Sequence, residues 1–319
     1  MPFAKVDEGS ALQGGSVLPV TVIIAAKNEE QNLPTCLESV RIFDDVVVVD
    51  SQSTDETVHI ARSLGADVVQ FFYRGGWPKK RQWAMENLSL RHEWVLLLDA
   101  DEAVSPELLV EIRHAIRNPE FNGCYIGLEM IFLGKRLRHC GASFYKLALF
   151  RRGFGAFECR TPDQDASMCD MEVHEHVVVK GKTCRLKAKI LHRNVDTLER
   201  YIQKHNEYSN WEARVWSDQR DGQEMSAEEM LLGSQARRRR WLKHHFMHWP
   251  GSPGILFAYR YILRAGFLDG IPGFIYCAFQ AIQLFHVKAK LYEKRVSSGL
   301  SDPATETDPN CEEGSHGGI

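Results

Sequence analysis

The chain has 319 residues, of which 44% are hydrophobic, so it can bury the core of one large α/β domain with an appendage and is not a disordered protein. Its formal net charge of −3 gives no nucleic-acid signature. The 8 cysteines form no CxxC pair, which fits reduced thiols in a cytoplasmic protein and not a disulfide framework.

The N-terminal segment shows no targeting signal. Residues 1–17 contain no basic segment followed by a long apolar run, so we expect a flexible N-terminus and a protein that stays in the cytoplasm. Beyond it, apolar and β-branched segments predict strands that are buried on both faces of a sheet; they are Val20–Ala26, Val46–Val49 and Trp94–Leu98.

Helical segments separate these strands. Ser53–Glu56 has the pattern of a capping box that opens a helix ended by Gly65, and Ser105–Glu107 opens another helix with proline in its first turn. Strand and helix alternate to about residue 117, which predicts an α/β fold with a mostly parallel, doubly wound sheet. The later segments are mixed, and Val177–Val179 with Thr183–Ile190 predicts a hairpin.

Carboxylates follow the strand at Trp94–Leu98 directly. Asp99 and Asp101 are two residues apart, so in an extended chain they point the same way and can hold one divalent cation through oxygen ligands. A nucleotide sugar needs such an ion, because its diphosphate leaves with developing negative charge. The alternative is that the aspartates cap the next helix, but Ser105 is already placed for that role.

The other strand ends carry polar groups as well. Asp50 ends the second strand and is suited to hydrogen-bonding a nucleobase or a ribose, and Ser53 follows it. The first strand runs into Ala26, Asn28 and Glu29. Each motif alone is weak, since aspartate after a strand is common turn chemistry, but together they predict a ligand site at the carboxyl edge of the sheet.

The segments Val22–Glu29, Val48–Thr57 and Leu98–Glu102 resemble, in this order, the family 2 glycosyltransferases of the GT-A fold, and the resemblance extends over roughly Leu18–Phe285. It implies a catalytic domain at residues 18–195. It also implies that Asp50 contacts a uridine-type nucleotide and that Asp99 and Asp101 form a DxD-like metal and diphosphate site. The expected donor-binding residues are Ala26, Asn28, Glu29, Asp50, Ser53, Asp99 and Ala100.

Two further segments, Val173–Glu175 and Gly266–Phe274, resemble the subgroup of lipopolysaccharide-core glucosyltransferases. This resemblance implies transfer of a hexose from a UDP-linked donor to a lipopolysaccharide-core, glycolipid or other cell-envelope acceptor. It also implies inversion at the anomeric carbon and a requirement for Mg²⁺ or Mn²⁺.

Glycosyl transfer needs a base that deprotonates the acceptor hydroxyl. In the family this base lies on a loop after the DxD strand, and here Glu175 is the first candidate and Glu172 the second; a polar strand edge is the structural alternative. His192 follows an apolar segment and is a candidate metal or diphosphate ligand, although a structural histidine fits equally well.

Cations and amides also gather at the start of the helix that precedes the DxD strand. Arg81 and Gln82 can reach the donor phosphate or base, because a guanidinium group and helix N-terminal amides both suit anions. A solvated helical face is the competing interpretation.

The C-terminal region, residues 196–295, is expected to be helical, basic and amphipathic, with a disordered tail at 296–319. Arg237–Arg240 and the interleaved aromatic residues after it favour binding to an anionic membrane surface over nucleic acid, with the protein peripheral on the inner face of the cytoplasmic membrane. Polar residues interrupt Gly266–Phe285, so an interfacial or core location is expected there instead of a spanning helix.

Other classes of protein fit less well. A sugar nucleotidyltransferase would carry a glycine-rich loop after the first strand, and a dinucleotide-binding oxidoreductase would carry GxGxxG there; neither is present. A glycoside hydrolase would leave the strand-end motifs unexplained. A membrane-docked nucleotide-sugar-binding protein without turnover stays open as the non-enzymatic alternative.

Overall fold

The computed structural model describes residues 17–159, 170, 172, 175–193, 197–218, 246 and 249–297. The expectations for residues 1–16, Arg237–Arg240 and residues 298–319 lie outside these described residues and stay predictions. The chain forms two compact units: the first runs to Tyr201 and includes Arg260–Tyr276, and the second contains Ile202–Tyr259 and the chain from Cys277 onward.

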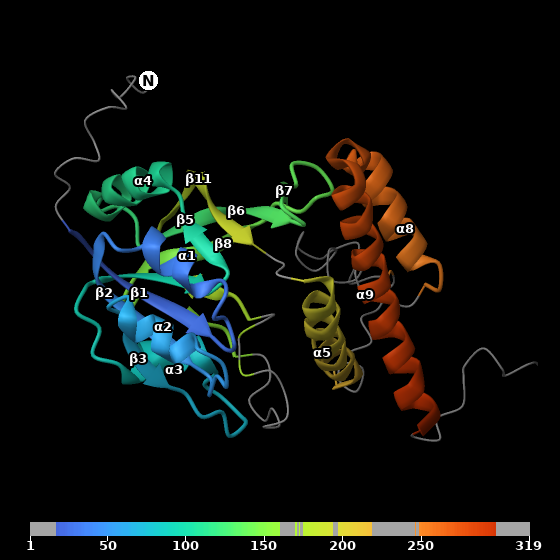
Figure 1. Cartoon of the computed structure of the whole chain (residues 1–319), viewed down its shortest axis with the longest axis horizontal. Coiled ribbons are helices and arrows are strands. Elements are labelled where there is room, and N and C mark those ends of the chain that lie inside the picture. Colours follow the sequence, from blue (N-terminus) through green and yellow to red (C-terminus); the bar gives the residue numbers. More distant parts are fainter. Residues whose placement is uncertain are drawn as a thin grey trace, which may run out of the picture. The chain divides into compact units, whose positions relative to one another are not determined.

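The predicted parallel sheet forms the first part of the first unit. Strands β1 (Leu18–Ala26), β2 (Phe43–Asp50), β3 (Asp67–Gln70) and β4 (Trp94–Asp99) pair in parallel in the order β3-β2-β1-β4 (Figure 1). Most apolar residues of β1, β2 and β4 are buried on both faces, which is why these strands read as continuous hydrophobic runs and not as alternating ones, while those of the edge strand β3 are partly buried.

Helices cover both faces of this sheet. Helices α1 (Leu33–Ser39), α2 (Thr57–Ser63) and α4 (Pro106–Arg117) contribute to one apolar core, and α3 (Lys80–Asn87) contributes to the other. The alternation of strand and helix therefore gives the doubly wound arrangement that the sequence predicts. Ser105 caps α4, because its Oγ accepts a hydrogen bond of 3.2 Å from the Leu108 amide.

The capping box predicted at Ser53–Glu56 is wrong. Helix α2 begins at Thr57, and the Thr57 amide donates to the Asp55 carboxylate at 3.0 Å. Ser53 does not cap the helix because its amide donates to the Asp50 carboxylate and its Oγ accepts from the Asn28 amide. Ser53 therefore connects the ends of strands β1 and β2 and does not cap helix α2.

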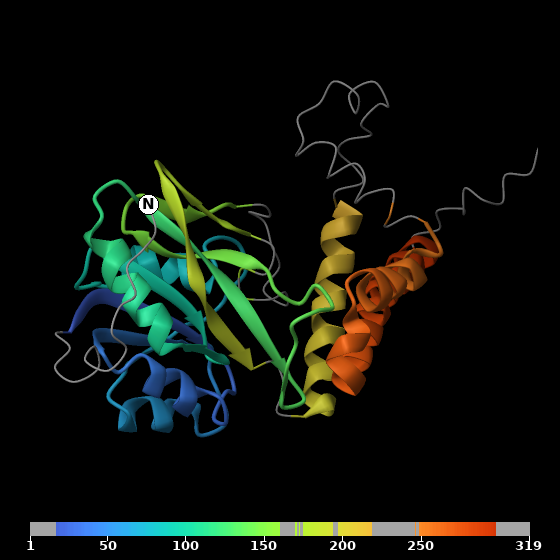
Figure 2. The same cartoon turned by 90° about the horizontal axis from the view of Figure 1, so that it is seen from above.

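The sheet continues with mixed pairing. Strands β8 (Tyr145–Arg151), β6 (Gly123–Phe132), β11 (Thr183–Arg193) and β5 (Glu102–Val104) follow β4 in this order, and β7 (Lys135–Arg136) pairs with β6. Strands β6 and β11 run parallel, as Figure 2 shows, while the other added pairs are antiparallel.

The hairpin predicted at residues 177–190 does not form. Strand β10 (Val177–Val179) pairs instead with β9 (Gly155–Phe157) in a separate two-stranded sheet. β11 joins the main sheet because Leu186 and Ile190 enter its apolar core. Turn residues between two β-like segments were therefore not enough to predict pairing.

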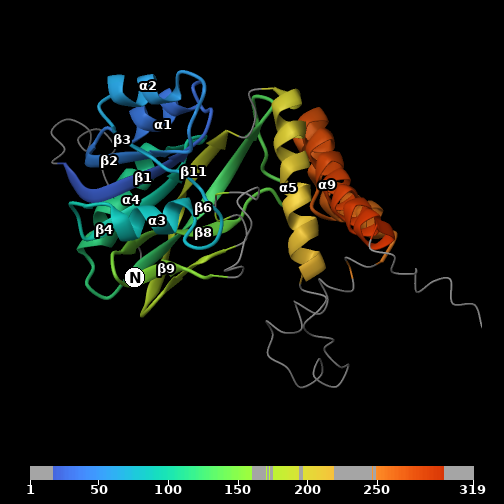
Figure 3. The ribbon, with the colours of Figure 1, turned by 90° about the horizontal axis from the view of Figure 1, so that it is seen from below.

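Helices make up the remainder of the described chain. α5 (Leu198–Asp218) confirms the helix expected after residue 196, and α8 (Ser252–Ala258), the π-helix η2 (Tyr259–Leu263), the 3-10 helix η3 (Gly266–Asp269) and α9 (Gly270–Ser297) follow. In the second unit α5 and α9 lie side by side (Figure 3), with Ala213 and Val287 buried together. The stretch Gly266–Ser297 is long and apolar enough to cross a membrane by composition, and 22% of its most apolar window is buried.

Candidate active site

The predicted strand-end motifs meet at one edge of the sheet. The parallel register places Ala26 beside Asp50 and Ala25 beside Asp99. Strand β1 is central, so the loops that follow β1, β2 and β4 converge. Ligands of open α/β sheets bind at such an edge.

Hydrogen bonds join the loops after β1 and β2 into one unit. The buried Asp50 carboxylate accepts from the Ser53 amide and from Gln70 Nε2, both at 2.9 Å. The Asn28 amide donates to Ser53 Oγ at 2.8 Å, and Asn28 Oδ1 accepts from the Thr54 amide at 2.8 Å. Asn28 has a φ of 53°, a left-handed conformation that asparagine tolerates well.

Glu29 extends this connection. Its amide donates to Thr57 Oγ1 at 2.8 Å, and its buried carboxylate accepts from Asn32 Nδ2 at 2.7 Å. Arg200, from the start of α5, lies 3.3 Å from the same carboxylate. Glu29 therefore holds the β1 loop in place through interactions within the protein.

The acidic residues after β4 lie in a turn and not in an extended chain. β4 ends at Asp99, the turn covers Ala100 and Asp101, and Glu102 begins β5. The prediction that both aspartates point the same way from an extended segment is therefore wrong. Their side chains meet different cationic partners.

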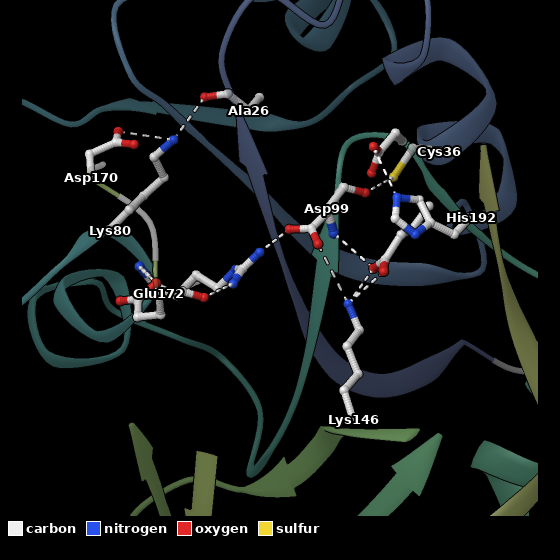
Figure 4. A network of polar contacts seen from close by, with 11 residues as sticks. Ala26, Cys36, Lys80, Asp99, Lys146, Asp170, Glu172 and His192 are labelled. Atoms are coloured by element: carbon white, nitrogen blue, oxygen red, sulfur yellow. Dashed lines mark hydrogen bonds and ion pairs between the residues drawn. The ribbon is translucent and has the colours of Figure 1, made fainter. Parts of the chain in front are cut away.

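The Asp99 carboxylate faces two cations from different elements, as Figure 4 shows. One oxygen pairs with the Arg81 guanidinium from α3, and the other lies 3.7 Å from Lys146 Nζ on β8. Burial would raise the pKa of Asp99, but Arg81 and Lys146 hold it well below its ordinary value. Asp99 is therefore ionised at neutral pH.

Glu102 completes this side of the site. Its side chain is fully buried, both of its oxygens lie 2.6 Å from Lys146 Nζ, and it accepts from the Asp99 amide at 3.0 Å. Burial raises the pKa of Glu102, and the neighbouring Asp99 and Asp101 add to that effect, while Lys146 opposes it. Lys146 is thus the shared cation of two carboxylates.

His192, on β11, pairs with Asp101. Its Nε2 lies 3.2 Å from Asp101 Oδ2. Burial by itself would lower the pKa of His192, but Asp101, Glu102 and Asp99 raise it to about 9. The structure therefore brings together His192 and Asp101, which the sequence had assigned to one metal site.

The loop that carries the candidate bases is tied to the start of α3. The Glu172 carboxylate accepts from the Gln82 amide at 3.0 Å and from the Arg81 amide at 3.3 Å, and so caps the helix. Burial raises the pKa of Glu172, although Arg81 and these amides oppose the effect. The backbone amides of Arg81 and Gln82, in the first turn of α3, are therefore already hydrogen-bonded to a carboxylate of the protein itself.

Glu175 lies in a buried ion pair. Its Oε1 is 2.8 Å from Lys79 Nζ, and the two side chains are 1% and 0% exposed. Lys80 is also fully buried, with its Nζ 3.2 Å from both Asp170 and the Ala26 carbonyl. The competing interpretation of a solvated helical face is therefore wrong for Lys79 and Lys80.

Both polar atoms of the Gln82 side-chain amide have a hydrogen-bond partner within the protein. Its Nε2 donates to Glu86 at 2.6 Å, and its Oε1 accepts from the Phe157 amide at 2.8 Å. This side chain braces α3 against β9. The geometry thus favours Arg81 over Gln82 as a donor-binding residue.

Comparison with known proteins decides the family. The profile described as glycosyl transferase family 2 matches residues 21–165. An uncharacterized glycosyltransferase of Rickettsia typhi is 32% identical over 206 residues, which cover 61% of this chain and 67% of that protein. The chain belongs to glycosyltransferase family 2.

Other similar proteins extend over more of the chain. The lipopolysaccharide core biosynthesis glycosyltransferase LpsC of Rhizobium meliloti is 27% identical, covering 87% of this chain and 93% of LpsC. A solved mannosyltransferase of Pyrobaculum calidifontis, in complex with GDP-Man and Mn²⁺, matches 87% of this chain and 88% of that chain at 15% identity and a TM-score of 0.46. Membership of family 2, together with the parallel half-sheet β3-β2-β1-β4 and helices on both of its faces, identifies the fold of the first unit as GT-A.

The residues at the strand edge suit a divalent ion that arrives with a ligand. Among the described residues no group of three acidic, histidine or cysteine side chains forms a ready cage. Two buried nitrogens there, Arg81 Nε and His192 Nδ1, have no hydrogen-bond partner within the described part of the chain. Mg²⁺ is typically held by one or two carboxylates together with substrate phosphates, so Asp99 and Asp101 fit such an ion.

Sequence reasoning missed three important residues. Lys79 pairs with Glu175, Lys80 with Asp170 and Lys146 with Glu102. A lysine within a strand or at a helix start normally reads as a surface residue. The run Lys79–Arg81 opposite the acidic segment after Asp170 was the signal that could have revealed two of them.

Proposed function

We propose that this glycosyltransferase transfers a hexose from a UDP-linked donor to a lipopolysaccharide-core, glycolipid or other cell-envelope acceptor, with inversion and with help from Mg²⁺ or Mn²⁺. The observation that carries the proposal is the convergence of Asp50, Asp99 and Asp101 at one sheet edge beside Arg81 and His192. The similarity to LpsC across 87% of the chain supports the acceptor class.

The loops after β1 and β2 would hold the nucleoside part of the donor. Their shared hydrogen bonds through Asn28, Asp50 and Ser53 fix the backbone before a ligand binds. A prearranged site loses less conformational entropy on binding. Asp50 is 0% exposed and both of its carboxylate oxygens accept hydrogen bonds, so it would have to exchange one of these partners before it could accept from the base or ribose.

The acidic turn would serve the diphosphate. Asp99 and Asp101 would hold the divalent ion, with His192 as a third candidate ligand, and the ion supplies Lewis-acid neutralisation of the leaving diphosphate. Arg81 is already oriented toward this point. Its guanidinium group can exchange the Asp99 carboxylate for phosphate oxygens, because its planar donors match both.

One carboxylate must take the proton of the acceptor hydroxyl. Glu175 and Glu172 stay the candidates, and both are held close to α3. Burial raises the pKa of Glu172, which brings a carboxylate nearer the pH at which a general base is most effective. Glu175 would need to separate from Lys79 before it could act, since its side chain is 1% exposed.

We also propose that the protein works at the inner face of the cytoplasmic membrane. A glycolipid acceptor is presented there, and exposed apolar residues in the first unit support this location.

The first experiment is a thermal-shift panel of nucleoside diphosphates and nucleotide sugars, each with and without Mn²⁺. A ligand that binds the native state raises its melting temperature. We expect a Mn²⁺-dependent shift with UDP and its sugars. Asp101→Asn should remove this shift, and Asp67→Asn, a control whose side chain is 71% exposed, should retain it. No shift with any nucleotide would contradict the proposal.

A further inference from the structure

An apolar surface stands out on the first unit at the junction of η2, η3 and α9. Six large apolar side chains lie exposed within this short stretch, and Leu263 and Ile271 are each 76% exposed. Soluble proteins rarely group so many exposed apolar residues. We call this set the apolar turn; it consists of Ile262, Leu263, Phe267, Leu268, Ile271 and Phe274.

Buried polar contacts hold the backbone of the apolar turn in place. Asp269 is 3% exposed, and its carboxylate accepts from the Arg138 amide at 3.1 Å and the His139 amide at 2.9 Å. Arg260 donates to the Cys140 carbonyl at 2.9 Å. The inner side of the turn is therefore polar and paired, while its outer side is apolar.

Close backbone packing makes the turn rigid. A Cβ added to Gly273 would lie 2.4 Å from the Gly266 carbonyl oxygen, so only glycine permits this approach of α9 to η3. Ala265 and Gly270 both have positive φ, which ends one helical segment and redirects the next. The backbone path of the apolar turn, fixed by this close packing, therefore places the apolar side chains at the surface; loose packing is not the cause.

Cations border the apolar turn. Lys135 and Arg136 on β7 are exposed, and Lys135 Nζ lies 3.3 Å from the position that a Cβ on Gly270 would take. Arg264 within the turn is also exposed. Residues 131–141 and 259–276 contain a single acidic residue, Asp269, and it is buried. Arg136 Nε lies 3.4 Å from the partly buried Glu129 carboxylate, which offsets part of its charge, while Lys135 and Arg264 keep the surface positive.

We propose that the apolar turn inserts into the headgroup and upper acyl region of an anionic lipid bilayer, with Lys135, Arg136 and Arg264 at the phosphates. This inference rests on the proposed membrane location and identifies the surface responsible. Apolar side chains gain free energy on leaving water, and lipid phosphates attract the surrounding cations. The same surface would hold the catalytic unit at the depth of a glycolipid headgroup.

The test is flotation of the full chain with vesicles of phosphatidylglycerol and phosphatidylethanolamine. The variant carries Ile262→Ser, Leu263→Ser and Ile271→Ser. The control carries Leu64→Ser, Val110→Ser and Phe154→Ser, which change exposed apolar residues elsewhere in the first unit. We expect the variant to lose about tenfold or more in vesicle partition, since each buried apolar side chain contributes free energy, while the control binds like the wild type.

A second variant tests the charges. Lys135→Gln with Arg136→Gln should reduce binding to these vesicles several-fold at low salt and little at high salt, because ions screen the attraction. Equal binding to neutral phosphatidylcholine vesicles would contradict the anionic requirement.

Three outcomes would overturn the inference. They are no vesicle binding by the wild type, unchanged binding by the Ile262–Leu263–Ile271 variant, and a change of that variant from dimer to monomer, which would make the surface a contact between copies of the chain. The donor-dependent thermal shift is measured without lipid. Its retention alongside any of these outcomes would reject the membrane surface and leave the proposed transfer reaction standing.

Discussion

The buried pair of Lys79 and Glu175 allows a structural role to be separated from a catalytic one. The two side chains are 0% and 1% exposed, and their charged atoms lie 2.8 Å apart. Removing one partner of a buried ion pair leaves an uncompensated charge and costs about 3–5 kcal/mol. A change of 1 kcal/mol moves the melting temperature of a domain this large by about 2–4 °C. Lys79→Met should therefore lower it by roughly 6–20 °C.

Replacing both partners should restore stability. An apolar pair of similar volume is often neutral or stabilising relative to a buried ion pair, so Lys79→Met with Glu175→Leu should melt near the wild type. The exposed pair of Glu38 and Arg41, 2.7 Å apart, is the matched control, and Arg41→Gln should change stability by less than about 1 kcal/mol. Single variants within about 0.5 kcal/mol of the wild type would refute the reasoning from burial.

The double variant then reports on catalysis. The assay is release of UDP from the nucleotide sugar that gives the largest thermal shift. If Glu175 is the base, the stable double variant should lose about 10²–10⁴-fold in rate, the usual contribution of a general base. Wild-type turnover by that variant would show that Glu175 is structural and would leave Glu172 as the candidate.

Three further predictions concern other buried groups. Asp269→Ala should lower the free energy of unfolding in urea by about 1–3 kcal/mol, because it leaves the partly buried Arg138 and His139 amides without their acceptor. Arg81→Met should weaken UDP binding measured by calorimetry but strengthen binding of Mn²⁺ alone, since Asp99 loses its guanidinium partner. Asp50→Asn should weaken UDP binding and also reduce stability, because its amide nitrogen would face the Gln70 donor.

The sequence predicted the strands and their ends because one physical cause controls both. Apolar β-branched runs are buried on both faces, and the runs of β2 and β4 stop at Asp50 and Asp99, whose carboxylates need polar partners. The parallel register then brings these ends together without further information. The fold class and the meeting of these strand ends could therefore be predicted from local patterns.

Partners of the acidic residues could not be predicted in the same way. Lys146 reaches Asp99 and Glu102 only because β8 inserts beside β4, a pairing between segments far apart in the chain. The predicted capping box shows the same limit. Ser53 could cap a helix or hydrogen-bond to the neighbouring strand ends, and in the structure it bonds to Asn28 and Asp50. Such choices depend on tertiary contacts that no local pattern contains.

The pairing of charges at the site has a consequence for how ligands bind. In the free protein Asp99 pairs with Arg81, Glu102 with Lys146 and Asp101 with His192. A divalent cation that binds alone would have to displace the protein's own cations from these carboxylates. A diphosphate that binds alone would have to displace the carboxylates from the protein's cations. Each ligand by itself therefore competes with an existing ion pair. A cation and a diphosphate bound together add almost no net charge and let both sets of groups keep a partner. Binding of Mn²⁺ and UDP should therefore be strongly cooperative, each tightening the other by the same factor. The thermal shift with both ligands should exceed the sum of the separate shifts, and simple additivity would show that the two ligands do not share these charges.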